Sequence, residues 1–179
     1  MTVWLSIIIW CSIIIHVLYT LYVLKYFGIT HDFSCTYYYM ERQKKGRGKL
    51  FSILLLLIIV FIIPIWIIVS LRSASPRSVA VLPALVGLCL AVVMFTPRYK
   101  RRKWLVKLHY SAAIIAAVLT ILWIMAACPK SLIVVAVLFT ILTVLAVCTR
   151  TLKTSTLFWL ELLAFYSVYI ILLIQLYSF

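Results

Sequence analysis

Acidic residues are scarce in this chain. Of its 179 residues only three are Asp or Glu, against 17 Lys and Arg, and charged residues of all kinds make up 11%. Soluble domains carry about 25% charged and roughly 45–50% apolar residues, whereas this chain is 67% hydrophobic. A soluble protein of this length could not bury so much apolar surface in one small core. The composition therefore excludes an ordinary soluble domain and predicts a protein that lies in a lipid bilayer.

Sequence signatures of common catalytic and metal centres are also missing. The chain has no glycine-rich phosphate loop, no G-x-S-x-G elbow, no Rossmann fingerprint, no H-E-x-x-H and no C-x-x-C. Acidic and nucleophilic side chains are few in the apolar runs. We therefore expect no cofactor and no resident metal, and the sequence leans against an enzyme.

Six apolar runs are long enough to cross a bilayer as helices. A spanning helix needs about 20 mostly apolar residues, and these runs are continuously apolar rather than alternating as in a barrel strand. The first run has no basic n-region and no small-residue cleavage site, so we expect it to be retained as a span. The predicted spans are residues 3–24, 50–71, 79–95, 105–127, 132–148 and 157–177. The sequence thus predicts an all-α, polytopic transmembrane helix bundle that forms a single domain over residues 1–179.

Lysine and arginine are distributed unevenly between the connections. The first, third and fifth connections, with the residues that flank them, hold fourteen of the seventeen, and the second and fourth hold three. Because short cytoplasmic loops carry the excess of positive charge in membrane proteins, we expect the odd-numbered connections to be cytoplasmic. These include the long loop 25–49. Both termini then lie outside, and the expected location is the inner, cytoplasmic membrane.

Two clusters of basic residues flank the second and fourth spans. Loops this short cannot hold a nucleic-acid-binding module, so we expect no nucleic acid as a partner. Anionic lipid headgroups are the nearer partner, each juxtamembrane Lys or Arg contributing on the order of 1 kcal/mol near the surface. The residues expected to contact anionic lipid are Lys44, Lys45, Arg47, Arg98, Lys100, Arg101, Arg102 and Lys103. A second copy of the chain or another membrane protein is also considered as a partner.

Three ionisable residues fall inside the predicted spans: His16, His109 and Glu161. Ionisable side chains are costly in lipid and mark helix contacts or function. With a rise of about 1.5 Å per residue, all three lie at similar depth in the cytoplasmic half of the membrane. One interpretation is a hydrogen-bonded pair of a histidine with Glu161 that specifies helix assembly. The alternatives are a proton or ion relay, or a metal held by two imidazoles and a carboxylate, a ligand set that zinc accepts.

The long cytoplasmic loop has an amphipathic half and a basic half. Asp32 or Ser34 is expected to cap a short interfacial helix that runs to Met40, with glycines ending it before the second span. The functional alternative is that part of this loop closes over the cytoplasmic mouth of the bundle, near His16 and His109. The residues proposed for that role are His31, Asp32, Ser34, Tyr37 and Tyr38.

Several short motifs follow one another through about the first 125 residues. They are "GITHDFSCTYYYM", "LF" at the start of a span, "PIW" inside it, "GLCLAVVMFTP" and "VKLHYSAAIIAAVLTILW". In this order they resemble a family of small multi-pass proteins of bacteria and their phages that has no assigned function. The resemblance places Ser34, Tyr37, Tyr38, Pro64, Trp66, Gly87, Pro97, His109 and Trp123 at motif positions. The family usually has small residues before the last proline, as in G-A-A-P, where this chain has "MFTP".

These patterns leave three functional hypotheses. The leading one is a non-enzymatic accessory or interaction component of the membrane, because acidic and nucleophilic residues are few. The second is a small transporter or channel-like protein with a His/Glu relay through His16, His109 and Glu161. The third is an intramembrane metal-dependent lipid hydrolase, which the buried histidines alone suggest.

Overall fold

The computed structural model describes residues 2–72, 77–96, 102–151 and 154–178, and within these ranges the chain is all-α, without a strand. Arg98, Lys100 and Arg101, three of the residues expected to contact lipid, lie outside the described ranges, as does Pro97. The helices are α1 (Thr2–Phe27), α2 (Cys35–Gln43), α3 (Lys49–Leu57), α4 (Ile63–Arg72), α5 (Val81–Phe95), α6 (Lys103–Ala127), α7 (Leu132–Cys148) and α8 (Thr156–Tyr177). Three short turns join them: η1 (Ile58–Ile62), which is π-helical, and the 3₁₀ turns η2 (Arg77–Ala80) and η3 (Pro129–Ser131).

Five helical segments are long and apolar enough to cross a membrane, which confirms a bundle of membrane-spanning type. They are Thr2–Phe27, Lys49–Arg72, Lys103–Ala127, Pro129–Cys148 and Thr156–Tyr177. The second segment joins α3, η1 and α4 into one rod. Where the third span is predicted, the structure has the shorter helix α5, of 15 residues. The reason is local, because the chain before Val81 forms a 3₁₀ turn instead of another α-helical turn.

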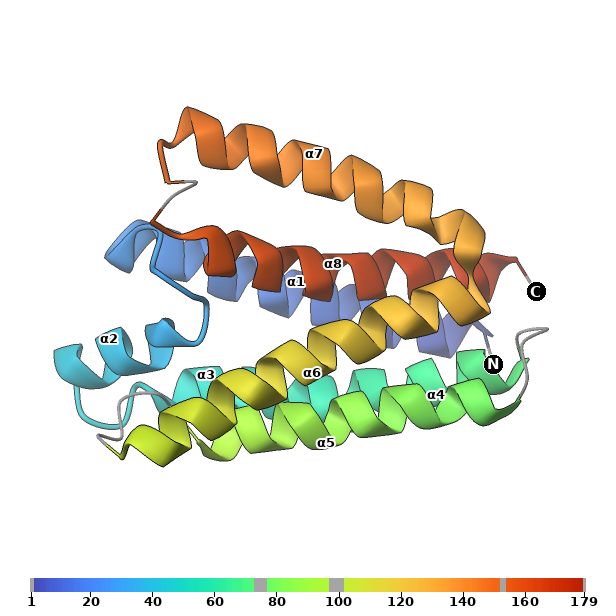
Figure 1. Ribbon diagram of the computed structural model, residues 1–179, viewed down its shortest axis with the longest axis horizontal. Helices are drawn as coiled ribbons and strands as arrows, with labels where there is room; N and C mark the ends of the chain where they lie inside the picture. The colour runs from blue at the N-terminus through green and yellow to red at the C-terminus, as the bar shows by residue number, and fades with distance from the viewer. Residues whose placement is uncertain (1, 73–76, 97–101, 152–153, 179) are drawn as a thin grey trace.

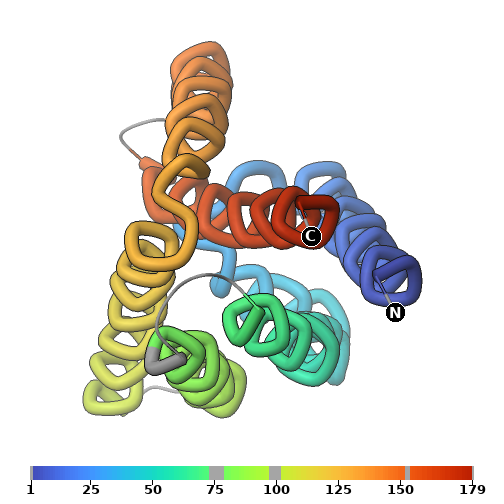
Figure 2. Tube along the Cα trace, turned by 90° about the vertical axis from the view of Figure 1, so that its right-hand side faces the viewer, coloured from blue at the N-terminus to red at the C-terminus, as the bar shows by residue number. Residues whose placement is uncertain are grey.

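The long helices run roughly along one direction, and successive segments point in opposite directions (Figure 1). Both ends of the chain lie at the same end of the bundle. The C-terminal ends of α1, α5 and α7 lie at the opposite end, which we call the basic end because the connections that follow these helices in the sequence carry most of the lysines and arginines. Helix α7 packs against α8 and stands out from the remaining helices (Figure 2). Its one buried residue is Ala146, so most of its surface is left for lipid.

The α3–α4 rod contains a widened turn before Pro64. Proline has no backbone N–H, and its ring inside a helix clashes with the carbonyl four residues earlier. Just before this proline, the Ile63 amide donates to the Ile58 carbonyl five residues back, as in a π-helix. Wide turns of this kind occur mostly as single irregularities in α-helices. Ile58 and Ile62, which belong to the turn, are both buried.

Small residues allow α5 to approach its neighbours closely. Helix α5 packs along α6. Gly87 lies on the side of α5 that faces α4. A Cβ atom at this position would lie 3.2 Å from Ile63 Cγ2. Gly87 therefore sets the separation of α4 and α5.

Candidate functional site

Asp32 organises the turn that leads into α2. Its buried side chain accepts hydrogen bonds at Oδ1 from Ser34 Oγ and from the Cys35 amide, both at 2.7 Å. Its Oδ2 accepts one from Tyr110 Oη at 3.0 Å and lies 3.1 Å from His31 Nδ1. An ionised carboxylate only accepts hydrogen bonds, and this set of donors matches that form. Asp32 is therefore the side chain that caps α2, whereas Ser34 makes no cap bond to the helix.

His109 joins α6 to the same turn. Its Nε2 lies 3.0 Å from Ser34 Oγ, and the ring is buried. Because Ser34 has one hydroxyl proton and donates it to Asp32, the histidine nitrogen is the donor in this contact. Hydrogen bonds thus run without a break from His31, whose side chain is 56% exposed, through Asp32 and Ser34 to His109.

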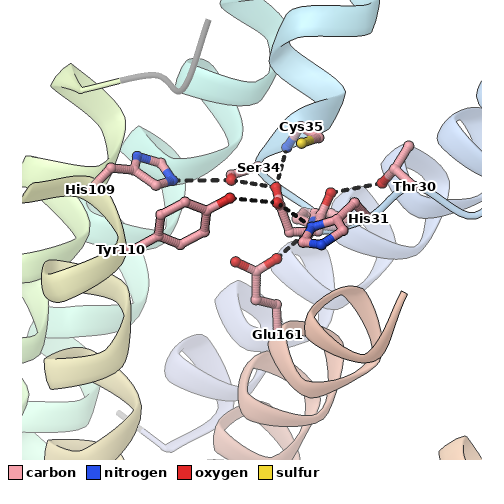
Figure 3. Close-up of polar contacts among 9 residues, drawn as sticks. Thr30, His31, Ser34, Cys35, His109, Tyr110 and Glu161 are labelled. Carbon is pink, nitrogen blue, oxygen red and sulfur yellow. Dashed lines mark hydrogen bonds and ion pairs between the residues drawn. The ribbon is translucent and has the colours of Figure 1, made fainter. Parts of the chain in front are cut away.

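Glu161 reaches the turn from α8. The Phe33 amide donates a hydrogen bond to its Oε2. In Figure 3, Glu161 approaches the turn from one side while His109 and Tyr110 approach from another, with Ser34 between the histidine and the turn. Within the described residues, no lysine or arginine forms an ion pair with Glu161. A direct bond between a histidine and Glu161 was expected, but the structure connects His109 and Glu161 through the Asp32–Ser34 turn instead.

His16 contacts this turn by its ring. It is completely buried on α1, and its ring centroid lies 5.3 Å from that of Phe33 and 5.0 Å from that of Phe165. Its Nδ1 lies 3.2 Å from Tyr169 Oη. Tyr19, one turn further along α1, bonds to Thr36 on α2 through its hydroxyl at 2.6 Å. All three predicted intramembrane residues therefore meet the same turn, although they come from three different helices.

An apolar cavity of about 390 Å³ begins at this turn. Its walls come from α3, η1, α4, α5, α6 and α8, which surround a common central region in the end-on view (Figure 2). Ser34, Tyr110 and Glu161 line one end of the cavity, and most of the remaining lining is aliphatic or aromatic. The cavity therefore combines one polar end with a long apolar wall.

The cavity opens sideways between α6 and α8. Ile114 and Val118 on α6 line it and are 63% and 50% exposed. Leu157 and Leu160 on α8 also line it and are 40% and 43% exposed. The side of the cavity between α6 and α8 is therefore lined by exposed apolar side chains.

The other residues singled out in the sequence lie around this site. Tyr37 is half-buried on α2, whereas Tyr38 is exposed and stacks with Arg42, whose guanidinium lies 5.6 Å from its ring centroid. The described basic residues expected to contact lipid, Lys44, Lys45, Arg47, Arg102 and Lys103, are exposed. The sequence did not indicate Phe33, Tyr110 or Tyr169 as parts of the site. Tyr110 was detectable in principle, because it follows His109 directly.

The site is better suited to binding than to acyl transfer. Ser34 lies between a carboxylate and a histidine, as an activated nucleophile would. Stabilising an oxyanion, however, needs N–H donors aimed at it, and the amides of Phe33 and Cys35 are directed at Glu161 and Asp32. Among the described residues, no group of three or more His, Cys, Asp or Glu is placed to hold a metal ion. The zinc alternative therefore gains no support from this part of the chain.

Comparisons with protein-family models, with curated proteins and with solved structures give no match to this chain.

Proposed function

We propose that this protein is an integral membrane protein that binds a membrane lipid, with one acyl chain in the cavity and the polar head at Ser34, Tyr110 and Glu161. The observation that carries the proposal is the polar cluster at one end of an apolar cavity whose side is lined by exposed apolar side chains. Sites for small molecules are usually concave and mostly apolar, with volumes of about 300–1,000 Å³ and a few convergent polar groups. Lipid binding is a specific form of the non-enzymatic membrane role that the sequence favours.

The length of the cavity supports an acyl chain as occupant. Along α6 its lining runs from Tyr110 to Ile121, which at 1.5 Å per residue is about 17 Å. One leaflet contributes about half of the roughly 30 Å hydrocarbon core. The polar end lies toward the basic end of the bundle and the apolar end toward its middle. A lipid in one leaflet is arranged in the same way. Its acyl chain extends over a similar length toward the middle of the membrane, and its polar head lies at the membrane surface.

For the whole chain we propose six crossings, with the basic end in the cytoplasm, both termini outside and the inner membrane as location. Turn η2 and α5 together run from Arg77 to Phe95, about 30 Å at the rises of 3₁₀ and α-helices. That length is sufficient for a crossing. The positive-inside rule supports the orientation. Exposed Lys44, Lys45 and Arg47 then lie where anionic headgroups gather.

The proposal is tested by counting the lipid that remains bound to the purified protein. Ala164 on α8 lines the cavity, and Ala136 on α7 is exposed and does not. We expect native mass spectrometry in mild detergent to find about one lipid per chain in the wild type. Ala164→Phe should lose this lipid because the ring fills the cavity, while the control Ala136→Phe should keep it. Equal occupancy in the two variants, or no lipid in the wild type, would contradict the proposal.

A proton relay is the second candidate function, because the hydrogen-bonded chain from His31 to His109 is continuous. It predicts proton-coupled flux in proteoliposomes that Ser34→Ala abolishes, since this substitution removes the middle link. The exposed Tyr38→Phe variant serves as a control on the same loop. Flux that persists in Ser34→Ala would eliminate the relay.

A further inference from the structure

We infer that the head of the bound lipid carries a primary ammonium group. This inference rests on the proposed lipid-binding function and adds the chemistry of the head. The feature behind it is a cavity end that presents a carboxylate and hydroxyl oxygens as hydrogen-bond acceptors.

Glu161 is the acidic side chain at this end of the cavity. It lines the cavity, and no lysine or arginine among the described residues forms an ion pair with it. Asp32 supplies a second carboxylate. It directly precedes Phe33, whose amide donates a hydrogen bond to Glu161. The described residues that contact the two carboxylates include no permanent cation. Asp32 already accepts several hydrogen bonds, whereas Glu161 accepts one from the Phe33 amide. An ionised carboxylate away from bulk water is costly unless an opposite charge or several donors accompany it, and a cationic ligand would supply both to Glu161.

The hydroxyl groups at the cavity end add acceptors. Ser34 and Tyr110 both direct their single proton to Asp32. Toward any other partner their oxygens therefore act as acceptors. An ammonium group has three donors and no acceptor, so it matches Glu161, Ser34 and Tyr110. A phosphate or carboxylate head has the opposite character, because it brings acceptors to an end of the cavity that already presents acceptors.

The experiment compares three amphiphiles of equal chain length: dodecylamine, dodecanol and dodecanoate. Each is added to the purified full chain in a maltoside detergent after bound lipid has been removed, and the shift in the unfolding temperature is measured over a range of concentrations. Dodecylamine should raise the unfolding temperature most and dodecanoate least. The net charge of the chain is +14, which by itself favours the anion. A preference for the amine must therefore come from the site.

Two variants test whether the preference for dodecylamine arises at Glu161. Glu161→Gln keeps an acceptor for the Phe33 amide but removes the charge, and it should weaken dodecylamine about tenfold, the effect of losing one charge-assisted hydrogen bond. Dodecanol should be almost unaffected. Glu41→Gln is the control, because Glu41 lies outside the cavity and accepts from the amides of Gly46 and Gly48.

The possible outcomes separate this inference from the proposed function. If dodecanoate stabilises the protein as much as dodecylamine, or if Glu161→Gln leaves the preference unchanged, the ammonium head is wrong while the cavity still binds an acyl chain. If none of the three amphiphiles shifts the unfolding temperature, and the wild type carries no lipid, both proposals fail together.

Discussion

Among single residues, Asp32 stabilises the fold most directly through its hydrogen bonds. The Ser34 hydroxyl and the Cys35 amide donate to it from buried positions, and the half-buried Tyr110 of α6 donates to it as well. A buried donor left without an acceptor costs about 1–3 kcal/mol. Asp32 therefore ties the long loop to α6, and the position of Ser34 at the end of the cavity depends on it.

Asp32→Asn should lower the apparent unfolding temperature by several degrees. The amide replaces one acceptor oxygen by a donor, which faces either the hydroxyl of Tyr110 or the donors on the loop. For a chain of this size, 1 kcal/mol corresponds to a shift of about 2–4 °C. The control is Glu41→Gln, at a carboxylate nearer the surface of the same loop. Equal shifts for the two variants in a thermal unfolding assay would show that Asp32 has no special role.

Cys128 should react slowly with alkylating reagents. Burial raises the pKa of the Cys128 thiol to about 11, and only the thiolate is nucleophilic. Because the pKa is raised, the group is a neutral thiol at pH 7, and its reaction rate should increase about tenfold per pH unit up to about pH 10. The measurement uses iodoacetamide and a variant in which the other four cysteines are replaced by alanine. A rate that levels off near pH 9, as for glutathione, would contradict the expected burial.

At the scale of helices, Gly87 limits how closely α5 and α4 pack. A methyl group there would touch Ile63 at 3.2 Å, which a small shift can relieve. We expect Gly87→Ala to change stability little, because the better helix propensity of alanine offsets the tight contact. Gly87→Leu should lower the free energy of unfolding by about 1–3 kcal/mol through overpacking. Thermal unfolding of the pair in detergent is the measurement, and similar stability of both variants would show that the two helices are not held at a fixed separation.

The helices could be predicted from the sequence, and the contacts of the site could not. Apolar runs are a local property, so the five long segments begin and end within about three residues of the predicted spans. The third predicted span, residues 79–95, begins two residues before α5, because hydropathy does not distinguish a 3₁₀ turn from an α-helix. The site depends on pairs far apart in sequence: 75 residues separate Ser34 from His109, and 128 separate Phe33 from Glu161. Polar residues in apolar runs identified His16, His109 and Glu161, but only the fold shows that the Asp32–Ser34 turn lies between them.

At the scale of the whole molecule, the cavity and the distribution of charge belong to one arrangement. The polar end of the cavity lies toward the basic end of the bundle, and exposed apolar side chains of α6 and α8 line its side. Under the proposed function, a lipid of the leaflet next to the basic end would enter between these helices without moving its head through the hydrocarbon core. The exposed basic residues of the long loop are expected to attract anionic headgroups around this region, whereas the head inferred for the bound lipid carries an ammonium group. Under these proposals, the surface and the interior would select different lipids.

The orientation of the bundle leads to the last prediction. Lys45 in the long loop and Lys130 in η3 are both exposed and lie at opposite ends of the bundle. In a variant without native cysteines, Lys45→Cys should react with a membrane-impermeant maleimide only after intact cells are permeabilised, because the positive-inside rule places it in the cytoplasm. Lys130→Cys should react in intact cells. The reverse pattern would invert the orientation and place the polar end of the cavity in the outer leaflet. Labelling of both positions from the same side would show that the three segments between them, α3–α4, α5 and α6, do not all cross the membrane.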